Sequence, residues 1–182
     1  MQLCFAFLIF TFVRKDSFGD FPMPTIHLTS FIAAPQDRVF DLNRNLSLDK
    51  ISMEHFREEI VGGMRSGLMN KEDTVTWKGK HLFKTRFFTS KVTEMKPFET
   101  FTNKMVKGDF KFFEHQHFFK PVDNGTIVID IIKYETPYGW LGEMVNKFYV
   151  TPYLEKLIEN RNKVIKQYAE TDKWMALLSN RR

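Results

Sequence analysis

Two histidines, an aspartate and a tyrosine are the residues of this chain whose types and spacing could do chemistry. His115 and His117 alternate within an apolar run, and Asp130 and Tyr134 follow the turn signal Asn124-Gly125 at even spacing. Alternate residues of a strand point to one face, so a hairpin folded at this turn would gather all four side chains. Imidazole, carboxyl and phenol groups in apolar surroundings could act as general acids and bases.

The register of that hairpin follows from the Asn124-Gly125 dipeptide. A two-residue turn there pairs His117 with Ile132. One face then carries Phe113, His115, His117, Phe119, Val128, Asp130, Ile132 and Tyr134. The other face carries side chains that are costly to bury unpaired, namely Glu114, Gln116 and Lys133. We therefore assign the first face to the interior, and a slip of one residue would exchange the two faces.

Three interpretations of the polar cluster remain open. It is a hydrogen-bonded group that fixes the register, with Asp130 bonded to a diagonal His117, or it recognises the polar end of an apolar ligand. In the third interpretation His115 and His117 bind a metal ion. Only Asp130 is an obvious third ligand for an ion, so we predict neither a metal nor a cofactor.

The composition indicates one domain with a sizeable core. The chain has 182 residues, of which 43% are hydrophobic and 20 are Phe. So many bulky rings imply either a thick aromatic core or the lining of an apolar cavity. The net charge of +5 is dilute and no recognition motif occurs, which argues against a nucleic-acid partner. A single cysteine, Cys4, excludes an intramolecular disulfide and indicates a reducing compartment, so we expect a cytoplasmic protein.

Residues 1–22 are predicted to lie outside the fold. The apolar run Met1–Val13 is shorter than the roughly 20 residues of a membrane-spanning helix, and it lacks the charge and cleavage site of a signal peptide. We interpret these residues as an extension, with Met23 as an alternative start of translation. The other interpretations are a membrane anchor at residues 1–13, which would make the protein membrane-associated, and a segment packed on the domain.

The remaining sequence, which must position the cluster, reads as strands followed by one long helix. A first strand at 25–32 precedes two short helices at 35–44 and 47–53, the second capped by Ser47. Six further strands are predicted at 58–61, 73–81, 83–95, 100–107, 110–122 and 126–135. From Gly139 to Trp174 apolar residues recur at helical spacing, with a kink at Pro152 and a tail at 175–182. We predict an α+β fold in which a curved seven-stranded antiparallel sheet wraps round the long C-terminal helix.

This order of elements resembles the helix-grip fold of the START-like (SRPBCC) superfamily, which includes the Bet v 1 allergens and polyketide cyclases. The motifs that carry the resemblance are Ala34-Pro35 with Val39-Phe40, Thr74-Val75-Thr76-Trp77, His115-x-His117-x-Phe119, Gly125-Thr126 with Asp130 and Tyr134, and Pro137-Tyr138-Gly139-Trp140-Leu141-Gly142. They are similar to those of bacterial ligand-binding members. The resemblance implies a START-like domain at 23–174 with a deep apolar cavity between sheet and helix.

That cavity would be the ligand site. Its candidate residues are Trp77, His81, Phe88, Phe113, His115, His117, Phe119, Asp130, Ile132, Tyr134, Trp140, Met144 and Phe148. Within this set we expect Trp77, Phe113 and Met144 to contact the apolar part of the ligand. The polar side chains of His117, Asp130 and Tyr134 would orient its polar group.

We therefore expect a binding or carrier protein, without catalytic residues, for a small hydrophobic or amphipathic molecule such as a lipid, a quinone or a polyketide-like compound. No nucleophile elbow, phosphate loop, zinc-binding helix motif or dinucleotide fingerprint occurs in the sequence. One alternative is a cyclase- or dehydratase-type enzyme that uses the His, Asp and Tyr cluster. Another is a lipid or quinone chaperone in peripheral contact with a membrane. The sequence predicts no particular oligomeric state.

Overall fold

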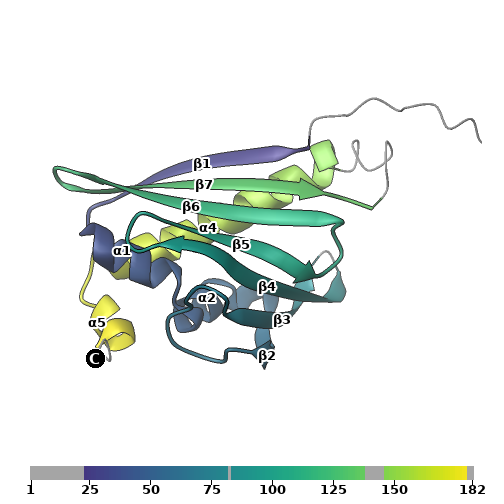
Figure 1. Cartoon of the computed structure of the whole chain (residues 1–182), viewed down its shortest axis with the longest axis horizontal. Coiled ribbons are helices and arrows are strands. Elements are labelled where there is room, and N and C mark those ends of the chain that lie inside the picture. Colours follow the sequence, from purple (N-terminus) through teal and green to yellow (C-terminus); the bar gives the residue numbers. More distant parts are fainter. Residues whose placement is uncertain (1–22, 82, 138–145, 180–182) are drawn as a thin grey trace, which may run out of the picture.

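A seven-stranded antiparallel sheet dominates the structure, a computed structural model that describes residues 23–81, 83–137 and 146–179 (Figure 1). The strands follow the order β1-β7-β6-β5-β4-β3-β2 across the sheet. Their bounds are β1 Thr25–Ile32, β2 Glu59–Gly63, β3 Thr74–His81, β4 Lys84–Lys96, β5 Thr100–Lys107, β6 Phe112–Val122 and β7 Gly125–Glu135. All seven predicted strands are confirmed, with ends that differ by at most two residues.

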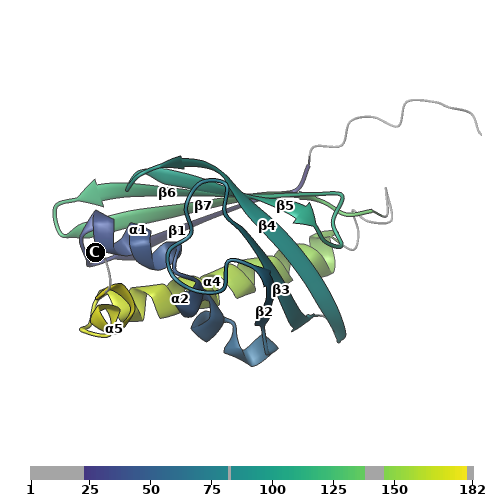
Figure 2. The same cartoon turned by 60° about the horizontal axis from the view of Figure 1, so that its bottom comes forward.

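The sheet curves round the helix α4, Thr151–Ala169, which lies along its concave side (Figure 2). Two short helices, α1 (Gln36–Asn43) and α2 (Leu46–Ser52), follow β1, and a 3₁₀ turn, η1, covers Glu54–Phe56. A π-helical turn, η2 (Asn146–Val150), leads into α4. The predicted arrangement of a sheet gripping a helix is confirmed.

The β6–β7 hairpin turns at Asp123 and Asn124, because Val122 pairs with Gly125. His117 therefore pairs with Asp130 rather than with Ile132, so the predicted register was wrong by two residues. A shift of two keeps every side chain on its face, since the side-chain period of a strand is two. Every second residue of β7 from Thr126 to Tyr134 is buried, as the predicted inner face requires.

The helix ends differ from the sequence prediction at two places. Asn45, not Ser47, caps α2, and its side-chain oxygen accepts hydrogen bonds from the next helical N–H groups. The long helix ends at Ala169 rather than at Trp174, and Pro152 lies in its first turn, where a proline causes no kink. Trp174–Leu178 forms a separate short helix, α5, so the predicted tail is not entirely outside the fold.

Two apolar clusters fill the space between sheet and helices. The larger cluster lies at the end of the sheet that α1, α2 and α5 cover, and it includes Phe40, Phe101, Phe119 and Ile165. The smaller one joins the first half of α4 to β1 and β7; its buried members are Ile26, Ile132, Tyr134, Val150, Leu154 and Ile158. Burial of these side chains supplies most of the driving force that packs the sheet against α4.

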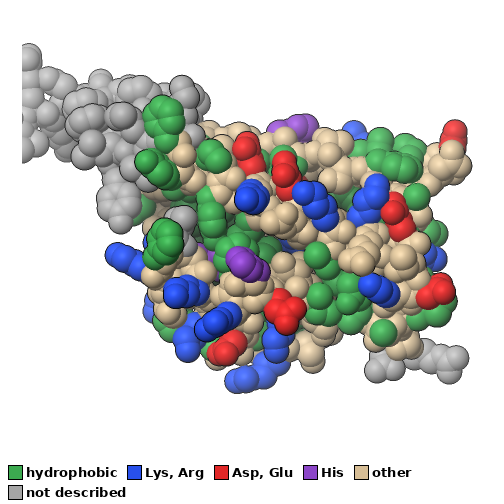
Figure 3. Space-filling view, turned by 180° about the vertical axis from the view of Figure 1, so that it is seen from behind, with side chains coloured by type: hydrophobic (Ala, Val, Ile, Leu, Met, Phe, Trp, Pro, Cys, Tyr) green, Lys and Arg blue, Asp and Glu red, His purple; other side chains and the backbone are tan. Residues whose placement is uncertain are grey.

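The outer surface is charged and mixed with apolar side chains. Lys and Arg side chains gather over the lower part of the face in Figure 3, in keeping with the net charge of +5.

Glu114, which we assigned to solvent, lies on the outer face of the sheet but is buried, because Lys104 pairs with it at 2.9 Å and Gln116 donates a hydrogen bond to it at 2.8 Å. Among the described residues, no helix combines the length and the apolar character needed to cross a membrane.

Candidate functional site

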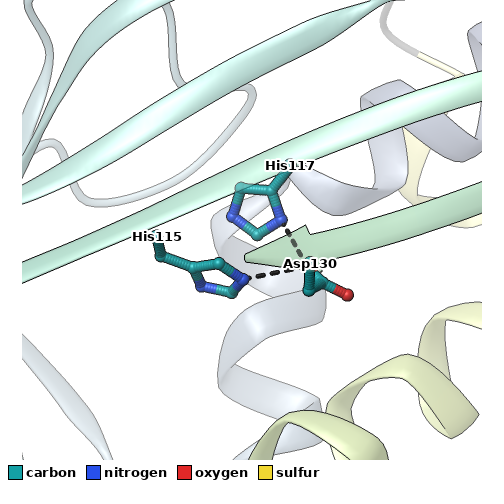
Figure 4. Close-up of side chains that lie close together, drawn as sticks. All are labelled: His115, His117 and Asp130. Carbon is teal, nitrogen blue, oxygen red and sulfur yellow. Dashed lines mark hydrogen bonds and ion pairs between the residues drawn. The ribbon is translucent and has the colours of Figure 1, made fainter. Parts of the chain in front are cut away.

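His115, His117 and Asp130 meet on the inner face of the hairpin (Figure 4). His115 Nε2 donates a hydrogen bond of 2.9 Å to Asp130 Oδ1. His117 Nδ1 lies 2.8 Å from the same oxygen, but its direction does not make a hydrogen bond, so we treat that contact as electrostatic. The side chains of Asp130 and His117 are 0% and 1% exposed, whereas that of His115 is 9% exposed.

Two asparagines complete this group, which we call the polar layer (Asn103, His115, His117, Asp130 and Asn162). Asn162 of α4 donates a hydrogen bond of 2.7 Å to Asp130 Oδ2 and so ties the helix to the sheet. Asn103 Nδ2 lies 3.5 Å from His117 Nε2. Among the described residues, the enclosed side-chain atoms without a hydrogen bond all belong to this layer: Asn103 Oδ1, His117 Nδ1 and Asn162 Oδ1.

The charges of the polar layer are set by its burial and its contacts. Burial alone would raise the pKa of Asp130, but the contacts with His115 and His117 lower it well below its usual value. Burial, together with the neighbouring His115, lowers the pKa of His117 to about 3 against the opposing effect of Asp130. At neutral pH the layer therefore holds an ionised carboxylate beside a neutral His117.

This arrangement predicts a stability that falls in acid. The pKa of His117 is about 3 in the folded protein and near 6.5 in the unfolded chain, so protons bind the unfolded chain more tightly between these values. Stability should decrease by about 1.4 kcal/mol per pH unit from this group alone as the pH falls from 6 to 4. His117→Gln should remove that part of the slope in urea unfolding measured across this range, whereas the exposed His27→Gln should keep it. Equal slopes in all three proteins would contradict the assignment.

The same three side chains could in principle ligate a metal, because each offers one ligand atom and these atoms all lie within 4.8 Å of one another. Hydrogen bonding already accounts for much of the geometry, since His115 directs its N–H group at Asp130. Our expectation of no metal stays a prediction. Asp130 bridges the directly opposite His117 and the diagonal His115, whereas the sequence interpretation gave it a diagonal His117 alone.

Tyr134 does not join the polar layer. Its hydroxyl lies 2.6 Å from Thr151 Oγ1 at the start of α4, and its burial raises the pKa of the phenol. Two other candidates, Phe119 and Ile132, are at most 2% exposed and belong to the two apolar clusters. A ligand could reach these three side chains, or those of His117 and Asp130, only if the sheet and α4 moved apart.

The inner face is less enclosed toward its other end. Trp77 on β3 pairs with Phe88 on β4, and the rings of Phe88 and Phe113 meet edge to face at 5.3 Å. Met105 lies beside them, because a Cβ atom on Gly108 would contact both Met105 and Phe88. All four side chains are partly exposed, although they lie on the inner face. We call Trp77, Phe88, Met105 and Phe113 the half-buried patch.

His81 lies on β3 beyond this patch and has partners that the sequence did not suggest. Its Nδ1 is 2.5 Å from the hydroxyl of Tyr153, and its Nε2 is 2.8 Å from Glu58 Oε1.

Phe148 is 61% exposed, so its ring is not enclosed between sheet and helix. The remaining candidates, Trp140 and Met144, lie outside the described residues. The only sequence signal for Tyr153 was its place one turn before the inward-facing Leu157 on the last helix.

Comparison with solved structures supports the fold. The chain is similar to TTHA0849 from Thermus thermophilus, with 20% identity over 80% of this chain and 97% of that one and a TM-score of 0.66. It is also similar to the Zhui aromatase/cyclase from Streptomyces sp. R1128, with 12% identity, coverage of 82% and 94%, and a TM-score of 0.62. A START superfamily protein from Mycobacterium smegmatis shares 14% identity over 80% and 97% of the two chains, with a TM-score of 0.59. No curated protein matches the sequence.

A family model supplies the more specific finding. The model described as polyketide cyclase / dehydrase and lipid transport matches residues 32–160, which include α1, every strand after β1 and the first half of α4. The matched range also contains the polar layer, apart from Asn162, and the half-buried patch. The chain has the helix-grip fold and therefore, by this match, belongs to the polyketide cyclase / dehydrase and lipid transport family.

Proposed function

We propose that this protein binds and carries a small hydrophobic or amphipathic molecule, held between the sheet and α4 against the half-buried patch. The observation that carries the proposal is the uneven burial of the inner face. Its residues near α1 and α2 are enclosed in the larger apolar cluster, whereas the aromatic side chains of the patch keep partly accessible surface. Apolar side chains with a few polar groups nearby are the usual lining of small-molecule sites.

The family supports a ligand of this class, because its description includes lipid transport. The polar layer also limits how far a ligand could extend along the inner face of the sheet. Along β6 the inner-facing residues run Phe113, His115, His117 and Phe119, so on this strand the layer lies between the patch and the larger cluster, whereas Trp77 on β3 packs against that cluster. A bound molecule would lie on the Phe113 side of His115.

Native mass spectrometry of the protein purified from its own host tests the proposal directly. A stoichiometric adduct that dissociates on denaturation and extracts into organic solvent is expected. The adduct mass would give the ligand class, and the mass of the chain would show whether residues 1–22 are present. A protein without an adduct, which also fails to bind any apolar probe after purification, would contradict a carrier function.

Substitution of two neighbouring phenylalanines tests where the ligand binds. Phe88 lies in the half-buried patch, whereas Phe87 on the same strand points to the outer face and is 53% exposed. Phe88→Ser should weaken binding of the fluorescent probe 2-methoxynaphthalene by about tenfold, since one aromatic contact is lost. Phe87→Ser should leave the dissociation constant unchanged in the same titration. Equal effects of the two substitutions would place binding elsewhere on the molecule.

A further inference from the structure

A second polar cluster, formed by Glu58, His81 and Tyr153, joins three separate elements. Glu58 precedes β2, His81 ends β3, and Tyr153 lies in the first turn of α4. The three groups form a hydrogen-bonded network in which the imidazole contacts the carboxylate at 2.8 Å and the phenol at 2.5 Å. None of them belongs to the polar layer.

Two neighbouring residues, Phe56 and Gly79, help to position this network. The ring of Phe56 stacks on that of His81 with centroids 4.9 Å apart. A Cβ atom on the buried Gly79 would lie 2.8 Å from Glu58 Cγ and 2.9 Å from His81 Nε2, so only glycine leaves room for this contact without a shift of one partner. Packing and hydrogen bonding together fix the His81 ring in one orientation.

The cluster follows the half-buried patch along β3, and its side chains are partly exposed. His81 lies on the inner face of β3 four residues after Trp77, and Tyr153 packs on the smaller apolar cluster together with Phe113. The side chains of His81 and Glu58 are 18% and 13% exposed. Glu58 also lines an open pocket of about 410 Å³ with Lys50, Ile51, Glu54, Arg57 and Glu59.

The three groups form one consistent set of hydrogen bonds when His81 carries its hydrogen on Nε2. His81 then donates from Nε2 to the carboxylate of Glu58 and keeps a lone pair on Nδ1. That lone pair accepts the hydrogen of the Tyr153 hydroxyl. Burial, with a further contribution from Glu58, raises the pKa of Tyr153 to about 12, so the phenol stays protonated at neutral pH. Its oxygen therefore keeps lone pairs that can accept another hydrogen bond.

We propose that Tyr153, oriented by His81 and Glu58, accepts a hydrogen bond from a hydroxyl group of the bound molecule, so that the preferred ligands are apolar compounds with a free hydroxyl. This assignment rests on the proposed binding function and names the ligand class for the same site. The polar layer is less suited to this role, because its Asp130 and His117 are fully enclosed. A ligand hydroxyl placed at Tyr153 would leave the rest of the molecule against Phe113 and Phe88.

Three related probes test the assignment by fluorescence titration. 2-Naphthol carries the hydroxyl, 2-methoxynaphthalene replaces its hydrogen by a methyl group, and naphthalene is a smaller reference. The wild-type protein should bind 2-naphthol about fivefold more tightly than either reference, the gain expected from one hydrogen bond to a neutral acceptor. Tyr153→Phe should abolish this preference and leave the affinity for both references unchanged. Tyr149→Phe, at a tyrosine that is 70% exposed, should keep the preference in full.

The outcomes separate the two proposals. If the wild-type protein binds none of the probes and carries no adduct from its host, the binding function fails, and the assignment of Tyr153 fails with it. If it binds none of the probes although it carries an adduct, only the assignment of Tyr153 fails. Binding of all three probes with equal affinity, or a preference for 2-naphthol that survives in Tyr153→Phe, overturns the assignment and leaves the binding function intact. The same holds if His115→Gln removes the preference while Tyr153→Phe keeps it. Circular dichroism of each variant confirms that it is folded.

Discussion

Replacing Asp130 with Ala should lower the free energy of unfolding by about 3 to 5 kcal/mol, the cost of removing one member of a buried ionic group. Asp130 is fully buried and has contacts with His115, His117 and Asn162. Its loss would leave the imidazole of His115 and the amide of Asn162 without their acceptor, and it would remove the carboxylate beside His117. Urea unfolding at pH 7 measures the change.

Two comparisons identify the cause of that loss. Ile129→Ala alters the adjacent residue on the outer face, and its smaller effect controls for truncation of a β7 side chain. Asp130→Asn keeps the size, but its amide nitrogen would face a donor, either His115 or Asn162, so it should also be strongly destabilising. Because the pKa of Asp130 is lowered in the folded protein, the stabilisation is complete above the unfolded value of 3.8 and is lost as the pH falls through the folded value. A difference between wild type and Asp130→Asn that does not shrink below pH 3.8 would refute the ionic explanation.

Arg161→Met should cost about 3 kcal/mol, because it breaks the contact between α4 and the two short helices. Arg161 is 7% exposed, and its guanidinium contacts Asp49 at 2.8 Å and the side-chain and backbone oxygens of Asn43 at 3.2 and 2.6 Å. Burial raises the pKa of Asp49, although Arg161 acts in the opposite direction. The Asp49 side chain retains 22% exposure, so water partly replaces the lost partner and keeps the loss at the lower end of the range for buried pairs.

The conservative variant separates charge from geometry. Arg161→Lys keeps the positive charge but cannot donate to Asp49 and Asn43 at the same time, so it should lose about half as much stability in thermal or urea unfolding. Lys163→Met, two residues along α4 and exposed, should change the free energy of unfolding by less than about 0.5 kcal/mol. If Arg161→Lys is as stable as the wild type, charge alone accounts for the contact.

The β6–β7 hairpin shows why the inner face could be predicted although its register could not. Alternation of apolar and polar residues decides the face, and a slip of two residues leaves the face unchanged. The turn was misplaced because Asp123-Asn124 and Asn124-Gly125 are both acceptable two-residue turns by residue type. As a result His115, His117 and Asp130 were correctly brought together, but with the wrong partners opposite them.

The cluster of Glu58, His81 and Tyr153 shows the limit of sequence reasoning. Tyr153 follows His81 by 72 residues, and Glu58 lies between η1 and β2, where no periodic pattern fixes a direction for the side chain. Such a contact depends on how far α4 advances along the sheet, which helical spacing does not determine. The short helix α5 was missed for a related reason, because only Leu178 among its five residues is buried.

The position of the polar layer would limit the size of a bound molecule. Asn162, Asp130 and the two histidines join α4 to β6 and β7, so moving the helix away from the sheet at this level would break an ionic group. Within the patch, Trp77 packs against the larger apolar cluster and Phe113 against the smaller one, whereas Phe88 belongs to neither. A change of side-chain size at Phe88 should therefore alter the patch at a smaller cost in stability than the same change at Trp77 or Phe113.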